Sequence, residues 1–211
     1  MLKIYNKLLM AFGPQYWWPV SKSTNRTEEQ SRFEISVGAI LTQNTSWQNV
    51  EKAISNLIEN KMLSKEAMKN AKPGRLAFLI RSSGYYKQKA KKLKIFANFS
   101  GDITRENLLG LWGIGPETAD SILLYAYNKP YFVVDAYTKR IFTRLGLLKG
   151  DESYEEIRSL FEKNLPKDVK IYNEFHALIV KLAKIHCRKK PNCNNCPLSS
   201  GCSFIQANQT Q

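Results

Sequence analysis

Apolar residues recur at helical spacing along most of this 211-residue chain, and this periodicity constrains the fold more than any other feature. The segments that carry it are 31–41, 50–58, 76–81, 88–99, 118–127, 136–145, 154–164 and 171–186. Single Pro and Gly residues separate them, and Asn107 is expected to cap a short helix that ends before Gly113. The run 131–134 is β-branched and aromatic, but a lone strand has no partner to pair with. We therefore expect an all-α fold.

The charge of the chain is strongly positive. It has 32 Lys and Arg residues against 18 Asp and Glu residues, a formal net charge of +14. Such a field concentrates polyanions, which makes nucleic acid the leading partner, although net charge alone does not exclude an anionic membrane surface. No stretch approaches the roughly 18 apolar residues that span a bilayer, and the N-terminus is too polar for a signal peptide. We expect a cytosolic protein, nucleoid-associated in a prokaryote, with no membrane partner.

All four cysteines lie within one 16-residue run near the C-terminus: Cys187, Cys193, Cys196 and Cys202. Thiols this close along the chain can share one metal centre, whereas scattered cysteines in a reducing compartment are mostly buried as small apolar residues. Four Cys with no interleaved His at ligand spacing suit either an iron–sulfur cluster or structural zinc.

Two glycines, Gly113 and Gly115, flank Ile114 between two expected helices. Glycines let the backbone approach a phosphate closely, and the dipole of the following helix favours an anion there. Taken alone, such a turn is equally a tight interhelical loop. Asp135 comes after the second of these helices and directly before a basic helix, where an N-cap is the simplest role for an isolated aspartate.

The order Leu-x-Gly-Ile-Gly-x-x-Thr-Ala, a buried helix, and then Val-Asp before a basic helix resembles the endonuclease III superfamily of DNA glycosylases. Segments 39–45 and 83–90 and the Cys-bearing tail extend the resemblance over most of the chain. It implies a two-lobed helix-hairpin-helix glycosylase fold with a C-terminal iron–sulfur cluster loop. One domain is expected over residues 24–134 and the other over residues 1–23 plus 135–211, with substrate between them and Asp135 facing it.

The resemblance assigns catalysis to Asp135. Cleavage of an N-glycosidic bond builds positive charge on the sugar, so a carboxylate can stabilise that charge and orient or deprotonate the attacking water. Bifunctional members carry a lysine where this chain has Glu117, and a carboxylate cannot form the imine of the strand-cleaving route. The resemblance thus implies a monofunctional DNA glycosylase of base excision repair, a hydrolase without AP lyase activity. We expect it to act as a monomer on double-stranded DNA that contains a damaged base.

Glu117, together with Trp17, Trp18, Pro19 and Trp47, is similar to the 3-methyladenine DNA glycosylase branch, in which the corresponding residues line the base pocket. A 3-methylated adenine is cationic in DNA, so indole faces and a carboxylate attract it. We therefore expect an alkylated base, first of all 3-methyladenine. A uracil or thymine mismatch glycosylase is the alternative on the same scaffold, and a non-catalytic DNA-binding iron–sulfur protein is the alternative from another class.

The resemblance also implies DNA contacts and a cofactor. Gln43 corresponds to the residue that fills the gap left by an extruded nucleotide. The other expected DNA contacts are Gly113, Ile114, Gly115, Thr118, Lys139, Arg188, Lys189 and Lys190, and for Lys139 a solvated helix face is the alternative. The tail resembles the family's 4Fe–4S loop, in which the cluster is structural. Its first gap is one residue shorter than the commonest spacing, which leaves zinc as the alternative metal.

Overall fold

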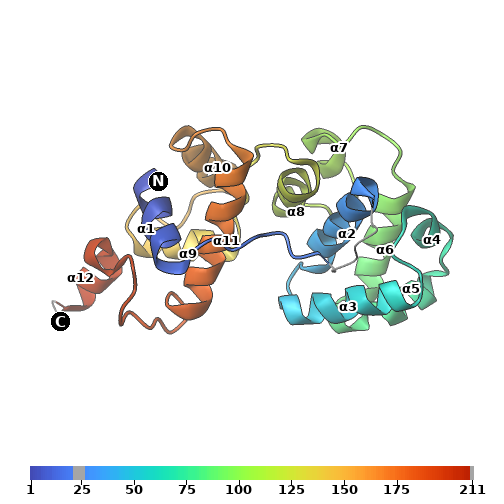
Figure 1. Cartoon of the computed structure of the whole chain (residues 1–211), viewed down its shortest axis with the longest axis horizontal. Helices are drawn as coiled ribbons and strands as arrows, with labels where there is room; N and C mark the ends of the chain where they lie inside the picture. Colours follow the sequence, from blue (N-terminus) through green and yellow to red (C-terminus); the bar gives the residue numbers. More distant parts are fainter. Residues whose placement is uncertain (21–26, 210–211) are drawn as a thin grey trace. The chain divides into compact units, whose positions relative to one another are not determined.

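The computed structural model describes residues 1–20 and 27–209, and its regular elements are helices (Figure 1). No strand occurs in those residues, which confirms the all-α expectation. The chain divides into two compact units, one of Met1–Trp17 with Lys129–Gln211 and one of Trp18–Asn128. The expected boundary between residues 23 and 24 lies outside the described residues. Within the described ranges, no helix has the length and apolar character needed to cross a membrane.

The unit Trp18–Asn128 is built of short helices around the second half of α2. Its elements are α2 (Glu28–Leu41), α3 (Trp47–Glu59), α4 (Lys65–Asn70), α5 (Pro73–Leu79), the 3₁₀ turn η1 (Arg81–Ser83), α6 (Tyr86–Asn98), α7 (Arg105–Leu109), α8 (Pro116–Ser121) and the π-helical turn η2 (Ile122–Ala126). A capping box of Thr27 and Gln30 starts α2. Val37, Ile40 and Leu41 are fully buried, and α2 packs against η2 and α6.

The other unit is organised around its longest helix, α11. Its elements are α1 (Leu2–Phe12), α9 (Ala136–Arg144), α10 (Tyr154–Lys163), α11 (Val169–Ile185), the 3₁₀ turn η3 (Ser199–Gly201) and α12 (Ser203–Gln209). α11 packs against both α1 and α9. Its core is aromatic: Phe132 stacks on Phe161 with ring centroids 4.2 Å apart, and Phe175 lies edge-on to Phe132.

The segment that delivers Asp135 is extended without being a strand. Two of its backbone N–H groups have side-chain acceptors on α10: Phe132 N donates to Glu162 Oε1 at 3.0 Å, and Val134 N donates to the Tyr154 hydroxyl at 3.4 Å. Val133 and Val134 are buried. The β-branched run therefore anchors the chain just before α9, and two of its backbone N–H groups bond to side chains rather than to a partner strand.

The structure corrects one helix cap and adds three helices. The expectation that Asn107 caps a helix was wrong, since α7 begins after Thr104, whose Oγ1 accepts from Asn107 N at 3.2 Å. Thr104 has the extended backbone that an N-cap requires, with φ −114° and ψ 161°. The helices α4 and α12, with 6 and 7 residues, are short and mostly polar, so no apolar period marks them. α1 has no side-chain cap that would signal its start.

Candidate active site

Asp135 is the N-cap of α9, and this role occupies one of its two carboxylate oxygens. Oδ1 accepts hydrogen bonds from Thr138 N at 2.7 Å and from Thr138 Oγ1 at 2.8 Å. The backbone of Asp135 is extended, with φ −109° and ψ 178°, as an N-cap requires. Because Oδ1 alone serves the helix, the N-cap role leaves Oδ2 available for a second interaction.

The second oxygen of Asp135 faces His176 on α11. Nε2 of His176 lies 3.5 Å from Oδ2, and the histidine is only 5% exposed. The Trp17 ring meets the imidazole edge-on, with centroids 5.7 Å apart. Burial raises the pKa of Asp135. The His176 ring and the Thr138 donors together lower it by more than burial raises it, so the pKa of Asp135 lies below its ordinary value. Asp135 is therefore ionised at neutral pH.

Gly113, Ile114 and Gly115 form the turn before α8. Gly113 has φ +84°, a conformation that side chains rarely adopt, while Gly115 has φ −91° and is the N-cap residue of α8. Ile114 is buried and its N–H donates to Leu111 O at 3.0 Å. Gly115 is exposed and a Cβ added there would contact nothing within 4 Å, so the backbone at this position is open to a close approach.

Gln43, in the loop after α2, lies against this turn. Its Nε2 donates to Gly113 O at 3.1 Å and to Thr118 Oγ1 at 2.8 Å. The structure thus brings together three residues that the sequence assigns to DNA binding, and Thr118 itself is buried.

Two of the tryptophans assigned to the base pocket lie together. Trp18 packs edge-on against Trp47 with centroids 5.2 Å apart, and against Tyr125 of η2 at 4.9 Å. The Trp18 indole covers Gly38, where an added Cβ would lie 3.3 Å from Trp18 Nε1. Tyr125 was not predicted, because an aromatic residue on a buried segment is normally core.

The expected site residues fall into both units. Trp18, Pro19, Gln43, Trp47, Gly113, Ile114, Gly115, Glu117 and Thr118 belong to the unit Trp18–Asn128. Trp17, Asp135, Lys139, the four cysteines, Arg188, Lys189 and Lys190 belong to the other unit. Glu117 and Pro19 are exposed within their unit.

The four cysteines are half-buried in the loop after α11, which α9 holds through two arginines. Arg140 donates from Nε and a terminal nitrogen to Cys187 O, at 3.0 and 2.8 Å. Arg144 donates to Cys187 Sγ at 3.3 Å, and its backbone carbonyl accepts from Cys202 Sγ at 3.5 Å. These contacts bring the first and the last cysteine of the run to the same residue of α9.

The four thiols of this loop are a donor set that suits either an iron–sulfur cluster or structural zinc. Burial raises the pKa of Cys196, and the charges of Cys187, Cys193 and Cys202 raise it further, so four thiolates here would repel one another without a cation. In the described part of the chain, no three Cys, His, Asp or Glu side chains are grouped as they would be around a metal ion.

The basic residues near this loop have different environments. Arg188, Lys189 and Lys190 are exposed, and the carbonyl oxygens of Arg188 and Lys189 accept from Arg144 at 2.6 and 2.9 Å. Lys139 is half-buried, and its Nζ donates to Glu152 O at 2.8 Å. The exposed group of three is therefore more accessible to a phosphate than Lys139.

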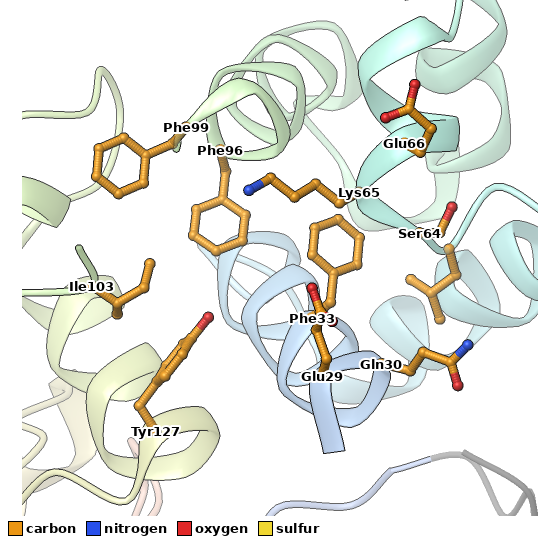
Figure 2. A pocket seen from close by; sticks show the side chains of 11 residues that line it. Glu29, Gln30, Phe33, Ser64, Lys65, Glu66, Phe96, Phe99, Ile103 and Tyr127 are labelled. Carbon is orange, nitrogen blue, oxygen red and sulfur yellow. The ribbon is translucent and has the colours of Figure 1, made fainter. Parts of the chain in front are cut away.

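A separate cavity of roughly 290 Å³ lies between α2, α4 and α6 and includes no residue that the sequence assigns to the site. Figure 2 shows the rings of Phe33, Phe96 and Tyr127 turned toward it. Burial raises the pKa of Tyr127, with Arg32 acting in the opposite direction.

A family model described as "HhH-GPD superfamily base excision DNA repair protein" matches residues 37–167. A Methanocaldococcus jannaschii protein, whose name assigns it provisionally as a DNA repair glycosylase, is 48% identical over 216 residues, which cover 95% of this chain and 94% of that protein.

Two solved structures share the fold. The 3-methyladenine DNA glycosylase of H. pylori bound to 1,N6-ethenoadenine matches with a TM-score of 0.73 and 30% identity, over 86% of this chain and 96% of that one. A non-covalent endonuclease III–DNA complex matches with a TM-score of 0.85 and 22% identity, over 100% of this chain and 97% of that one. At 22% identity the second likeness shows the fold alone.

Proposed function

Because the chain belongs to the HhH-GPD superfamily of base excision DNA repair proteins, we propose that it is a monofunctional glycosylase that hydrolyses the N-glycosidic bond of a damaged base in double-stranded DNA. The observation that carries this proposal is the ionised carboxylate of Asp135, fixed at the start of α9 by Thr138 and faced by His176. The substrate, the reaction mode and the residue roles below are parts of the same proposal.

In this mechanism Asp135 acts mainly through its charge. The bond to the base breaks with positive charge developing on the sugar, and a carboxylate beside that carbon stabilises it. The low pKa of Asp135 favours this electrostatic role, since a weak base removes a proton from water only after the sugar cation has formed. Oδ2 is the oxygen proposed to orient the water, because Oδ1 is held by Thr138.

Glu117 supports hydrolysis without strand cleavage. Its carboxylate stands at the position where the resemblance places the lysine of bifunctional enzymes, and it cannot form an imine with the sugar. The reaction would then end at an abasic site. Reduction of a reaction mixture with borohydride would trap no covalent protein–DNA adduct, whereas a trapped adduct would show that another amine serves as a lyase nucleophile.

The proposed substrate is an alkylated base, first of all 3-methyladenine. Trp18 and Trp47 form an aromatic cluster backed by the buried Tyr125, and Glu117 supplies an exposed carboxylate in the same unit. Cationic bases gain from both features through stacking, cation–π contact and charge attraction. Trp17 and Pro19 are proposed as further pocket residues on the strength of the resemblance, and the name of the H. pylori relative points to the same base.

The test is a comparison of base release from duplexes that each carry one defined lesion. We expect faster release of 3-methyladenine than of uracil or mismatched thymine. Trp18→Ala and Trp47→Ala should each weaken the stabilisation of the bound cationic base by about 1–3 kcal/mol, as the loss of a stacking platform does. Glu117→Gln should slow the cationic base more than a neutral one. Trp112→Ala is the matched control, since this indole lies outside the aromatic cluster and should leave the ratio of rates unchanged.

Faster release of uracil or thymine would favour the mismatch glycosylase instead. Absence of any base release, with binding to DNA intact, would favour a non-catalytic DNA-binding protein.

The proposed cofactor is a 4Fe–4S cluster held by Cys187, Cys193, Cys196 and Cys202, with zinc as the alternative. Bound there, the cluster would offset part of the negative charge of the four thiolates and order the loop that carries Arg188, Lys189 and Lys190. These basic side chains and the exposed backbone at Gly115 are the proposed phosphate contacts, together with Ile114, Thr118 and Lys139.

A further inference from the structure

Both polar ends of the Gln43 side-chain amide are hydrogen-bonded to groups on two other segments. Its Nε2 donates to Gly113 O and Thr118 Oγ1, at 3.1 and 2.8 Å. Its Oε1 accepts from the Lys92 ammonium on α6. Gly113 O can only accept and the ammonium can only donate, so the orientation of the amide is fixed by its neighbours.

These bonds hold the turn from both sides. The peptide unit between Gly113 and Ile114 has its carbonyl on Gln43 and its N–H on Leu111 O at 3.0 Å. A planar peptide held at both polar groups cannot rotate, and Thr118 joins the same amide to the first turn of α8. The turn with φ +84° at Gly113 is therefore tied to the helix that follows it.

Lys92 contributes packing as well as charge. A Cβ added at Gly113 would lie 2.5–2.9 Å from Cε, Cγ and Cδ of Lys92, so the lysine stem closes the face of the turn. One turn of α6 earlier, Lys89 is buried and its Nζ donates to Leu41 O at 2.8 Å and Ser83 O at 2.6 Å. Lys89 thus fixes the end of α2, two residues before Gln43.

We propose that Gln43 and Lys92 form a brace that holds the turn 113–118 in the geometry that binds DNA, so that Gln43 is a positioning residue for the turn. The inference rests on the proposed role of this turn in phosphate binding. It differs from the wedge role that the resemblance implies for Gln43, because insertion between bases would break the three hydrogen bonds of the amide. A brace affects every duplex alike, whereas a wedge acts only when a nucleotide is extruded.

Two substitutions separate the two sides of the brace. Gln43→Glu keeps an acceptor for Lys92 but replaces Nε2 with an oxygen, which cannot donate to Gly113 O, whereas the Thr118 hydroxyl can turn to donate to it. Lys92→Met removes the ammonium but keeps a stem to pack on Gly113. The controls carry the same charge changes elsewhere in the unit: Gln30→Glu preserves the capping box of α2, and Lys52→Met lies on the exposed face of α3.

The first measurement is hydrogen exchange of the segment 111–119 in the full chain without DNA. The brace predicts roughly tenfold faster exchange in Gln43→Glu, because Gly113 O loses its donor and faces a second acceptor instead, and a smaller increase in Lys92→Met. Both controls should exchange as the wild type does. Unchanged exchange in Gln43→Glu would overturn the brace, whatever the protein does with DNA.

The second measurement is the affinity for an undamaged duplex. The brace predicts that Gln43→Glu binds roughly tenfold more weakly than Gln30→Glu, which carries the same extra charge. Equal affinities would overturn the brace in favour of a wedge. So would an effect seen only in the fluorescence of a 2-aminopurine base placed beside a lesion, because that signal reports unstacking around an extruded nucleotide. If the wild type binds no duplex DNA, the proposed function fails, and exchange in the free protein still decides whether the brace exists.

Discussion

The imidazole of His176 faces Asp135, with Nε2 3.5 Å from Oδ2, although the two residues come from different helices. The contact exists because α11 packs on α9, whose N-cap is Asp135. The indole of Trp17 packs edge-on against the imidazole of His176. Burial alone would raise the pKa of Asp135, and the hydrogen bonds and charge of His176 together with the Thr138 donors bring it below its ordinary value.

His176→Asn should therefore move the acidic limb of the pH–rate profile to higher pH. The pKa of Asp135 in the wild type lies below its ordinary value, and removal of the imidazole takes away one of the groups that lower it. Activity would then be lost at a higher pH as the solution is acidified. His186→Asn is the control, because His186 stacks on Phe12 and contacts Asn192 O instead. An acidic limb that stays in place would show that His176 only fills space.

The two glycines of the turn should respond differently to alanine. Gly113→Ala should lower the free energy of unfolding by about 1–3 kcal/mol, because it forces φ +84° on a residue with a Cβ and crowds Lys92. Gly115→Ala should change it by less than about 0.5 kcal/mol, since its φ is −91° and its Cβ has open space. Urea unfolding measures both.

On DNA, Gly115→Ala should weaken binding to damaged and undamaged duplexes equally, because a phosphate contact carries no base information. A loss limited to one lesion would contradict a backbone contact at Gly115.

Lys89 should make the free energy of unfolding rise with pH between about pH 8 and pH 10.5. Burial, aided by the charge of Lys92, lowers the pKa of Lys89 from 10.5 to about 8. Between these values the unfolded chain keeps a proton that the folded protein has released, so stability increases with pH. The wild type should gain about 1.4 kcal/mol per pH unit there, relative to Lys89→Met.

Urea unfolding of both proteins from pH 7 to pH 10.5 checks this, and the difference between them removes the other titrating groups. A difference that is flat above pH 8 would mean that Lys89 keeps its proton in the folded state.

The cysteine loop predicts bound iron. The purified protein should be brown, with broad visible absorption from sulfur-to-iron charge transfer and about four iron atoms per chain in metal analysis. Cys196→Ser should lower the iron content, whereas Ser199→Ala, in the same loop, should not. Removal of the cluster should weaken DNA binding more than it slows base release at saturation, since hydrolysis transfers no electrons. Zinc without iron would establish the alternative metal.

The sequence predicts the helical class and the place of Asp135 because both follow from local signals. The apolar stripe of 171–186 and the polar residue before 136–145 become α11 and an N-capped α9. It does not predict His176 beside Asp135 or Lys92 beside Gln43, because these contacts depend on how helices pack. His176 and Lys92 lie in helical segments whose apolar period does not distinguish them from other polar residues of a helix. Thr104 rather than Asn107 caps α7 for a similar reason, since backbone geometry chooses between two suitable side chains.

The most direct test of the account is free-base release from a duplex with a single 3-methyladenine, followed by chromatography, for the wild type and Asp135→Asn. The variant keeps the shape of the side chain and an oxygen for Thr138 but removes the charge that stabilises the sugar cation. The account predicts that it still binds the lesion duplex while the rate of release falls roughly 10²–10⁴-fold. Near-wild-type release by Asp135→Asn would contradict the assignment of catalysis to this carboxylate.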